Sequence, residues 1–342
     1  MHLPAPRGPV SAALIDALVQ PPAPLPSRLR AAAAGPPTGR RTTPTALDDE
    51  DLQVSLLICY ELHYRGLSGV DDRWEWQPSL MALRGQLERR LEDGLRALVP
   101  YPDPVPPAQV PRALAQLVAG DGGPPLAGYL QRDATLQHFR EFVTHRSVYH
   151  LKEADPHTWA IPRLSGRSKA ALVEIQADEY GGGRPGRMHA ELFARTMRAL
   201  GLDDTYGAHV DAVPAVTLAT TTAMSLFGLH RRWRGALLGN LAALEMTSSL
   251  PNRRYGNGLR RLGYGREATW FYDEHVEADA VHEQVAAHDM CGAFAADHPE
   301  LAGDILFGAA CCLALDNRVA AHLLAHWEAG RSSLREPRPV AA

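Results

Sequence analysis

The stretch Trp270–His288, "WFYDEHVEADAVHEQVAAH", has the periodicity of an amphipathic helix and contains three potential metal ligands. At about 100° per residue, His275, Asp279 and His282 fall within one stripe roughly 60° wide. Apolar residues share this stripe, whereas charged residues such as Asp273 lie on the opposite side, so the stripe is predicted to face the core. Polar groups buried there need partners, so the three side chains either form ion pairs or hold a cation.

The composition is that of a globular protein with a sizeable core. The chain has 342 residues, of which 45% are hydrophobic and 22% charged, enough for one large or two smaller domains. A net charge of −4 indicates neither nucleic acid nor an anionic membrane as a partner. No apolar run is long enough to span a bilayer, and no signal peptide is recognisable. The 4 cysteines lack a pairing pattern, which favours a reducing cytoplasm.

Helical periodicity dominates the chain from Leu47 onward, and almost no segment alternates with a period of two, so an all-α fold is predicted. Residues 1–45 are rich in Pro, Ala and Arg and are expected to form a mostly disordered arm. Residues 331–342 are expected to form a disordered tail.

A second potential ligand, Glu245, stands alone on a Leu- and Ala-rich helix. It is the only acidic residue between Asp211 and Glu267. A carboxylate on such a helix needs a positive partner, which is either one of the nearby arginines or a cation bound between helices.

Three further candidates precede it. Glu179 follows the inward stripe of the helix that starts at Ser168, and His189 opens the next helix in register with its apolar residues. Glu153 lies near the end of an earlier helix on a mixed stripe, where an ordinary salt bridge is an equally good interpretation. Neighbouring residues could replace it as a ligand, namely Asp155 or His157.

The seven side chains comprise four carboxylates and three imidazoles, without a thiolate. This donor set suits iron or manganese better than structural zinc. Two cations would need a bridging carboxylate to offset their repulsion, and helical bundles are known hosts for such dinuclear sites.

The order and spacing of these residues resemble those of the haem-oxygenase-like diiron oxidases and oxygenases, also described as iron-containing redox enzymes. The resemblance covers about residues 130–325 and includes the glycine-rich segment "DEYGGGRPGRMHAELF". Its most specific element is the His-x3-Asp-x2-His motif, which follows an isolated glutamate by about thirty residues. The residues that match the family pattern are Glu153, Glu179, His189, Glu245, His275, Asp279 and His282.

The resemblance implies a haem-oxygenase-like helical bundle over residues 126–330, preceded by an N-terminal helical extension over residues 46–125. It also implies two iron ions, with manganese as a possible substitute. One ion would take Glu153, His189 and His282, and the other Glu245, His275 and Asp279, with Glu179 bridging. Such an enzyme would use O2 and a small-molecule substrate, could draw on an external electron donor, and could form a homodimer. Members of the family perform N-hydroxylation, desaturation or C–C cleavage, often in specialised metabolism.

The substrate pocket is expected beside the metals. Its predicted lining, from stripe position and proximity in sequence, is Tyr272, Met224, Phe227 and Met246. Arginines in the runs 231–234 or 253–254 could anchor a carboxylate, which favours an amino acid or another small carboxylic acid as substrate. The alternatives are a true haem oxygenase, which needs one proximal histidine and no carboxylate cluster, and a non-catalytic helical carrier or partner-binding protein.

Overall fold

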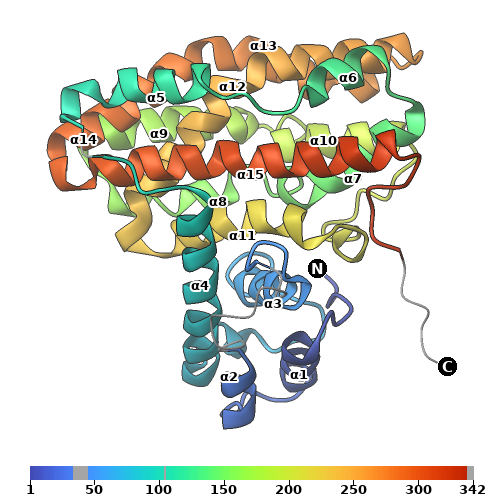
Figure 1. Cartoon of the computed structure of the whole chain (residues 1–342), viewed down its shortest axis with the longest axis vertical. Helices are drawn as coiled ribbons and strands as arrows, with labels where there is room; N and C mark the ends of the chain where they lie inside the picture. Colours follow the sequence, from blue (N-terminus) through green and yellow to red (C-terminus); the bar gives the residue numbers. More distant parts are fainter. Residues whose placement is uncertain (34–44, 104, 337–342) are drawn as a thin grey trace.

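A computed structural model describes residues 1–33, 45–103 and 105–336, apart from the side chains of Arg30 and of residues 277–281. Within these residues all regular secondary structure is helical and no strand occurs, which confirms the all-α prediction. Figure 1 shows an upper bundle of long helices above a smaller lobe that contains α1 to α4.

The upper bundle is formed mainly by helices that lie side by side across the molecule (Figure 1). Its α-helices are α5 (Val110–Ala119), α6 (Leu126–Arg132), α7 (Leu136–His150), α8 (Asp155–Thr158), α9 (Gly166–Glu179), α10 (His189–Ala199), α11 (Ala215–Leu229), α12 (Arg234–Arg261), α13 (Arg266–Gln284), α14 (Ala293–Asp297) and α15 (Ala302–Glu328). Short 3-10 segments connect them: η2 (Pro107–Gln109), η3 (Ile161–Arg163), η4 (Gly181–Gly183), η5 (Val210–Ala212), η6 (Arg231–Trp233) and η8 (Pro299–Leu301).

Helices α12 and α15 cross at a pair of glycines. A Cβ added to Gly239 on α12 would lie 1.8 Å from the carbonyl oxygen of Ile305, and one added to Gly308 on α15 would lie 1.9 Å from that of Ala236. The backbones therefore approach more closely than any side chain would allow. This contact sets the position of α12, which carries Glu245.

Residues 1–33 are folded, so the prediction of a disordered arm is wrong for this segment, while residues 34–44 lie outside the described part of the chain. Helices α1 (Pro9–Leu18) and α2 (Ser27–Ala33) form there. Leu14 and Leu18 on α1 are fully buried, and their spacing of four residues gives the helix an apolar stripe that packs against the lobe. Composition alone suggested disorder because the abundance of Pro, Ala and Arg in the segment outweighed this short stripe.

The rest of the lobe consists of α3 (Glu50–Glu61), the 3-10 helix η1 (Asp72–Trp76) and α4 (Pro78–Leu98). Helix α3 packs against α11 of the bundle, whereas α5 packs against α15 and α12. The helices of residues 46–125 thus do not form a single extension, because α5 joins the upper bundle. A buried ion pair between Lys152 and Glu61 also links the lobe to the turn after α7.

The C-terminal segment is ordered as far as Glu336, so the prediction of a disordered tail is wrong for residues 331–336. The carboxylate of Glu141 on α7 accepts hydrogen bonds from the backbone N–H of Ser333 (2.8 Å), the Ser333 hydroxyl (2.7 Å) and the Ser332 hydroxyl (2.9 Å). The indole N–H of Trp327 donates a further bond to it (2.8 Å). Burial alone would raise the pKa of Glu141, but these four donors lower it to about 2.

We expect Glu141→Gln to lower the free energy of unfolding at pH 7 by about 1–3 kcal/mol, because the amide offers one acceptor to donors that need two. The folded pKa of Glu141 lies below the unfolded value of about 4.3. The stability that this carboxylate contributes is therefore present above pH ~4.3 and is lost as the pH falls toward 2. Chemical denaturation at pH 7 and at pH 3 measures both effects.

The matched control is Glu328→Gln, which changes an exposed carboxylate on α15. It should leave the unfolding free energy within about 0.5 kcal/mol of the wild type. A Glu141→Gln protein as stable as this control at pH 7 would show that the C-terminal segment is not held by the carboxylate.

Beyond α13 the chain forms a π-helix, η7 (Val285–Gly292), in place of the expected α-helix. Its wider turns are typical of functional regions, and they leave Ala286 and Met290 fully buried against α9 and α12.

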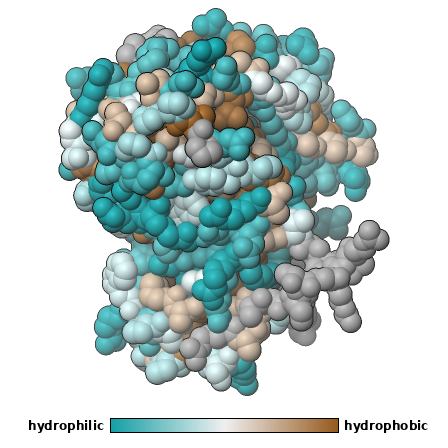
Figure 2. Space-filling view, turned by 60° about the vertical axis from the view of Figure 1, so that its left-hand side comes forward, coloured by the Kyte–Doolittle hydropathy of each residue, from teal (hydrophilic) through white to brown (hydrophobic). Residues whose placement is uncertain are grey.

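Among the described residues no single helix is long and apolar enough to cross a membrane, although one bent helix pair, His282–Asp297 with Pro299–Glu328, has a suitable length and composition. Figure 2 shows a face that is mainly hydrophilic with small hydrophobic patches.

Candidate metal centre

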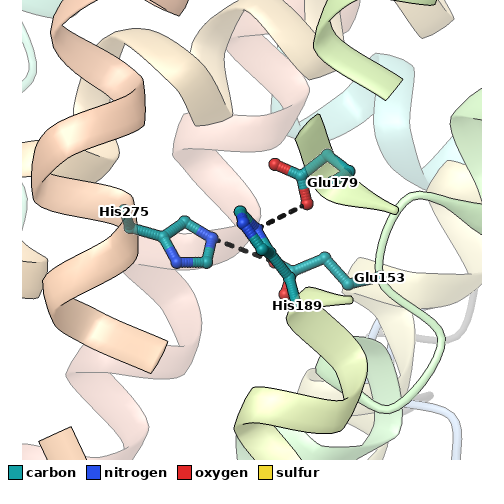
Figure 3. Close-up of side chains that lie close together, drawn as sticks. All are labelled: Glu153, Glu179, His189 and His275. Carbon is teal, nitrogen blue, oxygen red and sulfur yellow. Dashed lines mark ion pairs between the residues drawn. The ribbon is translucent and has the colours of Figure 1, made fainter. Parts of the chain in front are cut away.

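Six of the seven predicted ligands gather in the core of the bundle as two adjoining groups. In each group one potential ligand atom from every member lies within 4.8 Å of the others. Figure 3 shows the first group, in which the side chains converge from separate segments of the chain. The two groups, which share Glu179, are Glu153 with Glu179, His189 and His275, and Glu179 with Glu245 and His282. The side chain of Asp279 lies outside the described residues.

Glu153 is placed by a strained turn. Helix α7 ends at His150, and Ala154 has a φ of 73°, a left-handed conformation that costs a residue with a Cβ about 1–2 kcal/mol. The carbonyl of Ala154 accepts a hydrogen bond from Gln176 Nε2 on α9 (3.0 Å), which helps to hold the turn. Strain of this kind is frequently found beside functional residues.

Glu179 and His189 are brought together by the glycine-rich segment between them. Gly181 has a φ of 64°, and an added Cβ there would lie 2.5 Å from the backbone of Arg187, so the chain folds back on itself. Glu179 is the last residue of α9 and His189 the first of α10. Their side chains meet with 2.9 Å between Oε2 and Nδ1 (Figure 3).

All six side chains are buried, with exposures between 2% and 8%. Burial alone would raise the pKa of Glu153, but the imidazoles of His150 and His275 hold it well below its usual range. Burial would lower the pKa of His189, yet the Glu179 carboxylate raises it. The pKa of His282 is likewise lowered by burial but raised overall, to about 9, by Glu245 and Asp178. In the metal-free protein each of the three imidazoles therefore lies beside at least one carboxylate.

Hydrogen bonds orient two of the imidazoles. Nδ1 of His275 lies 2.8 Å from the carbonyl oxygen of Phe271, which can only accept, so Nδ1 carries the proton and Nε2 faces Glu153 at 3.7 Å. Nε2 of His282 bonds to Asp178 (2.9 Å), and its Nδ1 lies 3.3 Å from Glu245. Such partners on the far ring nitrogen are typical of metal-binding histidines.

The grouping differs from the expected division of ligands between two ions. His275 lies with Glu153 and His189, whereas His282 lies with Glu245, so the two histidines have exchanged places. The seven-residue separation puts both on one stripe of α13, about 10 Å apart along the helix axis. Which histidine faces which carboxylate depends on the helices packed against each end of that stripe, and the stripe itself does not contain this information.

The residues present suit divalent metal ions. Three carboxylates and three imidazoles, without a thiolate, favour iron or manganese. The buried Oε2 atom of Glu153 has no hydrogen-bond partner within the described part of the protein, an arrangement that is costly unless a cation completes it. Mutual repulsion of three buried carboxylates would also be relieved by bound cations.

A cavity of about 100 Å³ adjoins the two groups, with Glu153, Glu179, Glu245 and His275 in its lining. Of the four predicted pocket residues, Met224 lines it. Phe227, Tyr272 and Met246 are not among the described lining residues. Phe227 packs against Trp233, Tyr272 packs against Tyr255, and Met246 packs at the edge of the main core. Met246 is one position from Glu245, which rotates its side chain by about 100° around the helix, and Phe227 and Tyr272 are each three positions from Met224 and His275, a rotation of about 60°.

The arginines expected to anchor a carboxylate also lie elsewhere. Arg232 pairs with Glu92 at 2.6 Å, and neither the 231–234 run nor the 253–254 run lines the cavity. The arginine that does line it is Arg146 on α7. Sequence reasoning missed three residues in all, Arg146, His150 and Asp178. A signal for the first two was available, because Arg146 and His150 lie seven and three residues before Glu153, about two helical turns and one.

Comparison with known proteins places this geometry in context. Residues 140–317, just over half of the chain, match a family model described as an iron-containing redox enzyme. No curated protein matches the chain. The matched segment includes every residue of the two groups.

Proposed function

The chain belongs to the iron-containing redox enzyme family, and on this premise we propose that it is a non-haem diiron oxidase or oxygenase. Its substrate would be a small amino- or carboxylic-acid metabolite. The observation that carries the proposal is the position of Glu179, which belongs to both buried ligand groups and could bridge two ions.

The ligands follow the grouping found in the structure. Glu153, His189 and His275 would hold one ion, and Glu245 and His282 the other, with Glu179 between them. Asp279 remains a predicted seventh ligand from its place in the sequence motif. When bound, iron supplies the electrons for dioxygen reduction and the oxidising power for substrate chemistry, and manganese is a possible substitute.

The protein's own residues bind, orient and exclude water. The buried carboxylates would offset the positive charge of bound iron, and the surrounding core excludes bulk water from the site. The Phe271 carbonyl and Asp178 fix the ring orientation of His275 and His282. The reaction on the substrate would be N-hydroxylation, desaturation or C–C cleavage, with an external electron donor where the substrate supplies too few electrons. A cytoplasmic location suits the 4 free, buried cysteines.

The observations do not favour the alternatives. A haem oxygenase uses one proximal histidine, whereas three buried carboxylates stand beside the histidines here. A carrier that binds no metal would gain nothing from a buried Glu153 oxygen without a hydrogen-bond partner within the described part of the chain.

Anaerobic reconstitution with iron(II) tests the proposal directly. We expect about two iron ions per chain for the wild type and at most about one for His275→Ala. The control is His288→Ala, an exposed histidine beyond α13, which should bind as much iron as the wild type. Colorimetric iron analysis after gel filtration gives the stoichiometry, and a value near zero for the wild type would refute the diiron assignment.

A further inference from the structure

The cavity beside the ligand groups also contains an ion pair of its own. Arg146 on α7 and Asp316 on α15 both line the cavity, with 2.6 Å between Nη1 and Oδ1. The side chain of Arg146 is 23% exposed and that of Asp316 is 45% exposed. The pair therefore lies where the cavity meets solvent, and the more exposed Asp316 has room to change its position.

Arg146 lies on the same face of α7 as the metal-facing residues. Arg146 and His150 are four residues apart on α7, Glu153 follows in the turn after the helix, and all three line the cavity. His150 Nδ1 lies 2.8 Å from Glu153 Oε1, so this face leads to the first ligand group. The axial rise of about 1.5 Å per residue separates Arg146 from His150, the last residue of α7, by roughly 6 Å, and Glu153 lies in the turn beyond.

The other helices supply walls that suit a short aliphatic chain. On α12, Leu241 and Leu244 precede Glu245 on the cavity face, and on α15, Leu315 and Val319 flank Asp316. A ligand in this cavity would therefore meet apolar surface as well as an ion pair and the candidate metal ligands.

We infer that Arg146 and Asp316 form a recognition site for the carboxylate and ammonium groups of an α-amino acid, whose side chain extends along the apolar walls toward the ligand groups. The inference rests on the proposed function and narrows its substrate class. It also assigns which end of the substrate lies near the metal centre.

Charge balance favours a zwitterion over other small acids. A zwitterion can replace the Arg146–Asp316 contact with two contacts of the same kind, one to each partner. A carboxylic acid without an amine would bring a second anion beside Asp316, and an amine without a carboxylate would bring a second cation beside Arg146. An uncharged ligand would form an ion pair with neither Arg146 nor Asp316.

The size of the cavity limits the side chain. A cavity of 150 Å³ holds benzene in another protein, so about 100 Å³ suits a side chain of a few carbon atoms. The separation of roughly 6 Å between Arg146 and His150 along α7, with Glu153 beyond it, favours an extended, unbranched side chain over a compact one.

The test is a binding measurement that needs no turnover. Anaerobic calorimetry would compare the standard α-amino acids on iron(II)-loaded and metal-free protein. For the amino acid that binds most tightly, three analogues follow: the decarboxylated amine, the acid without the amine and the methyl ester. We expect each analogue to bind at least about tenfold more weakly, equivalent to about 1.4 kcal/mol.

Variants assign the two contacts. Arg146→Met should weaken amino-acid binding at least tenfold, while Arg146→Lys, which keeps the charge, should recover part of it. Asp316→Asn should abolish the preference for the amino acid over the acid without the amine. The matched controls are Arg132→Met and Asp133→Asn, which alter an exposed pair 3.9 Å apart that does not line the cavity. Circular dichroism and thermal unfolding establish that each variant is folded.

Three results would overturn the inference: no α-amino acid binds, binding is the same in folded Arg146→Met and wild type, or the acid without the amine binds equally well and Asp316→Asn changes nothing. Failure of the proposed function looks different. In that case the protein binds no iron, yet an amino acid still binds in an Arg146-dependent manner.

Discussion

Glu179→Gln protein should bind less than one iron ion per chain where the wild type binds about two, and its dioxygen consumption should fall more than about 100-fold. Loss of a residue that merely orients a ligand costs roughly 10–100-fold in metal affinity, and Glu179 is shared by both ligand groups. The amide is a neutral and weaker ligand, so it neither offsets the repulsion between two cations nor bridges them well. Competition with a chelator of known affinity measures the loss.

The control for this variant lies on the same helix. Glu174 is an exposed residue of α9, and Glu174→Gln should leave iron binding unchanged. Glu179→Gln should also lose the ion pair with His189 in the metal-free protein, so its stability without iron is measured separately. Two iron ions retained in Glu179→Gln would show that this residue does not bridge.

Gly308→Ala should be the most destabilising single-methyl change that we predict, lowering the free energy of unfolding by more than about 3 kcal/mol. The added Cβ would lie 1.9 Å from the carbonyl oxygen of Ala236, a backbone atom that cannot move without shifting α12. Because α12 carries Glu245, we also expect weaker iron binding. Gly239→Ala on the facing helix should behave in the same way, since its Cβ would lie 1.8 Å from the Ile305 oxygen.

Gly85→Ala provides the contrast. Gly85 lies within α4, where an added Cβ would meet only the flexible end of Arg89 at 3.9 Å. Alanine is the better helix former by about 1 kcal/mol, so this change should stabilise the protein slightly. Thermal and chemical unfolding of the three variants compare them directly, and equal stability of Gly308→Ala and Gly85→Ala would contradict a close α12–α15 contact.

The sequence by itself determined the fold class and the faces of the helices. Periodicity identified α13 as amphipathic, with His275 and His282 on its buried stripe, and both are buried. The isolated Glu245 and the pair Glu179 and His189 were recognised for the same reason, because polar side chains on apolar faces stand out locally. The resemblance that these residues carry led to the family to which the chain belongs.

Only the tertiary structure decided which side chains meet. Periodicity specifies that a face is buried but not which helix covers it, so His275 and His282 were assigned to the wrong carboxylates. For the same reason Arg146 was missed, since its role depends on Asp316, which lies 170 residues away in the sequence. The folded N-terminal segment and the contact of Ser333 with Glu141 also depend on distant partners. The local sequence indicates which buried polar side chains need hydrogen-bond or ion-pair partners. The packing of the helices decides which residues become those partners.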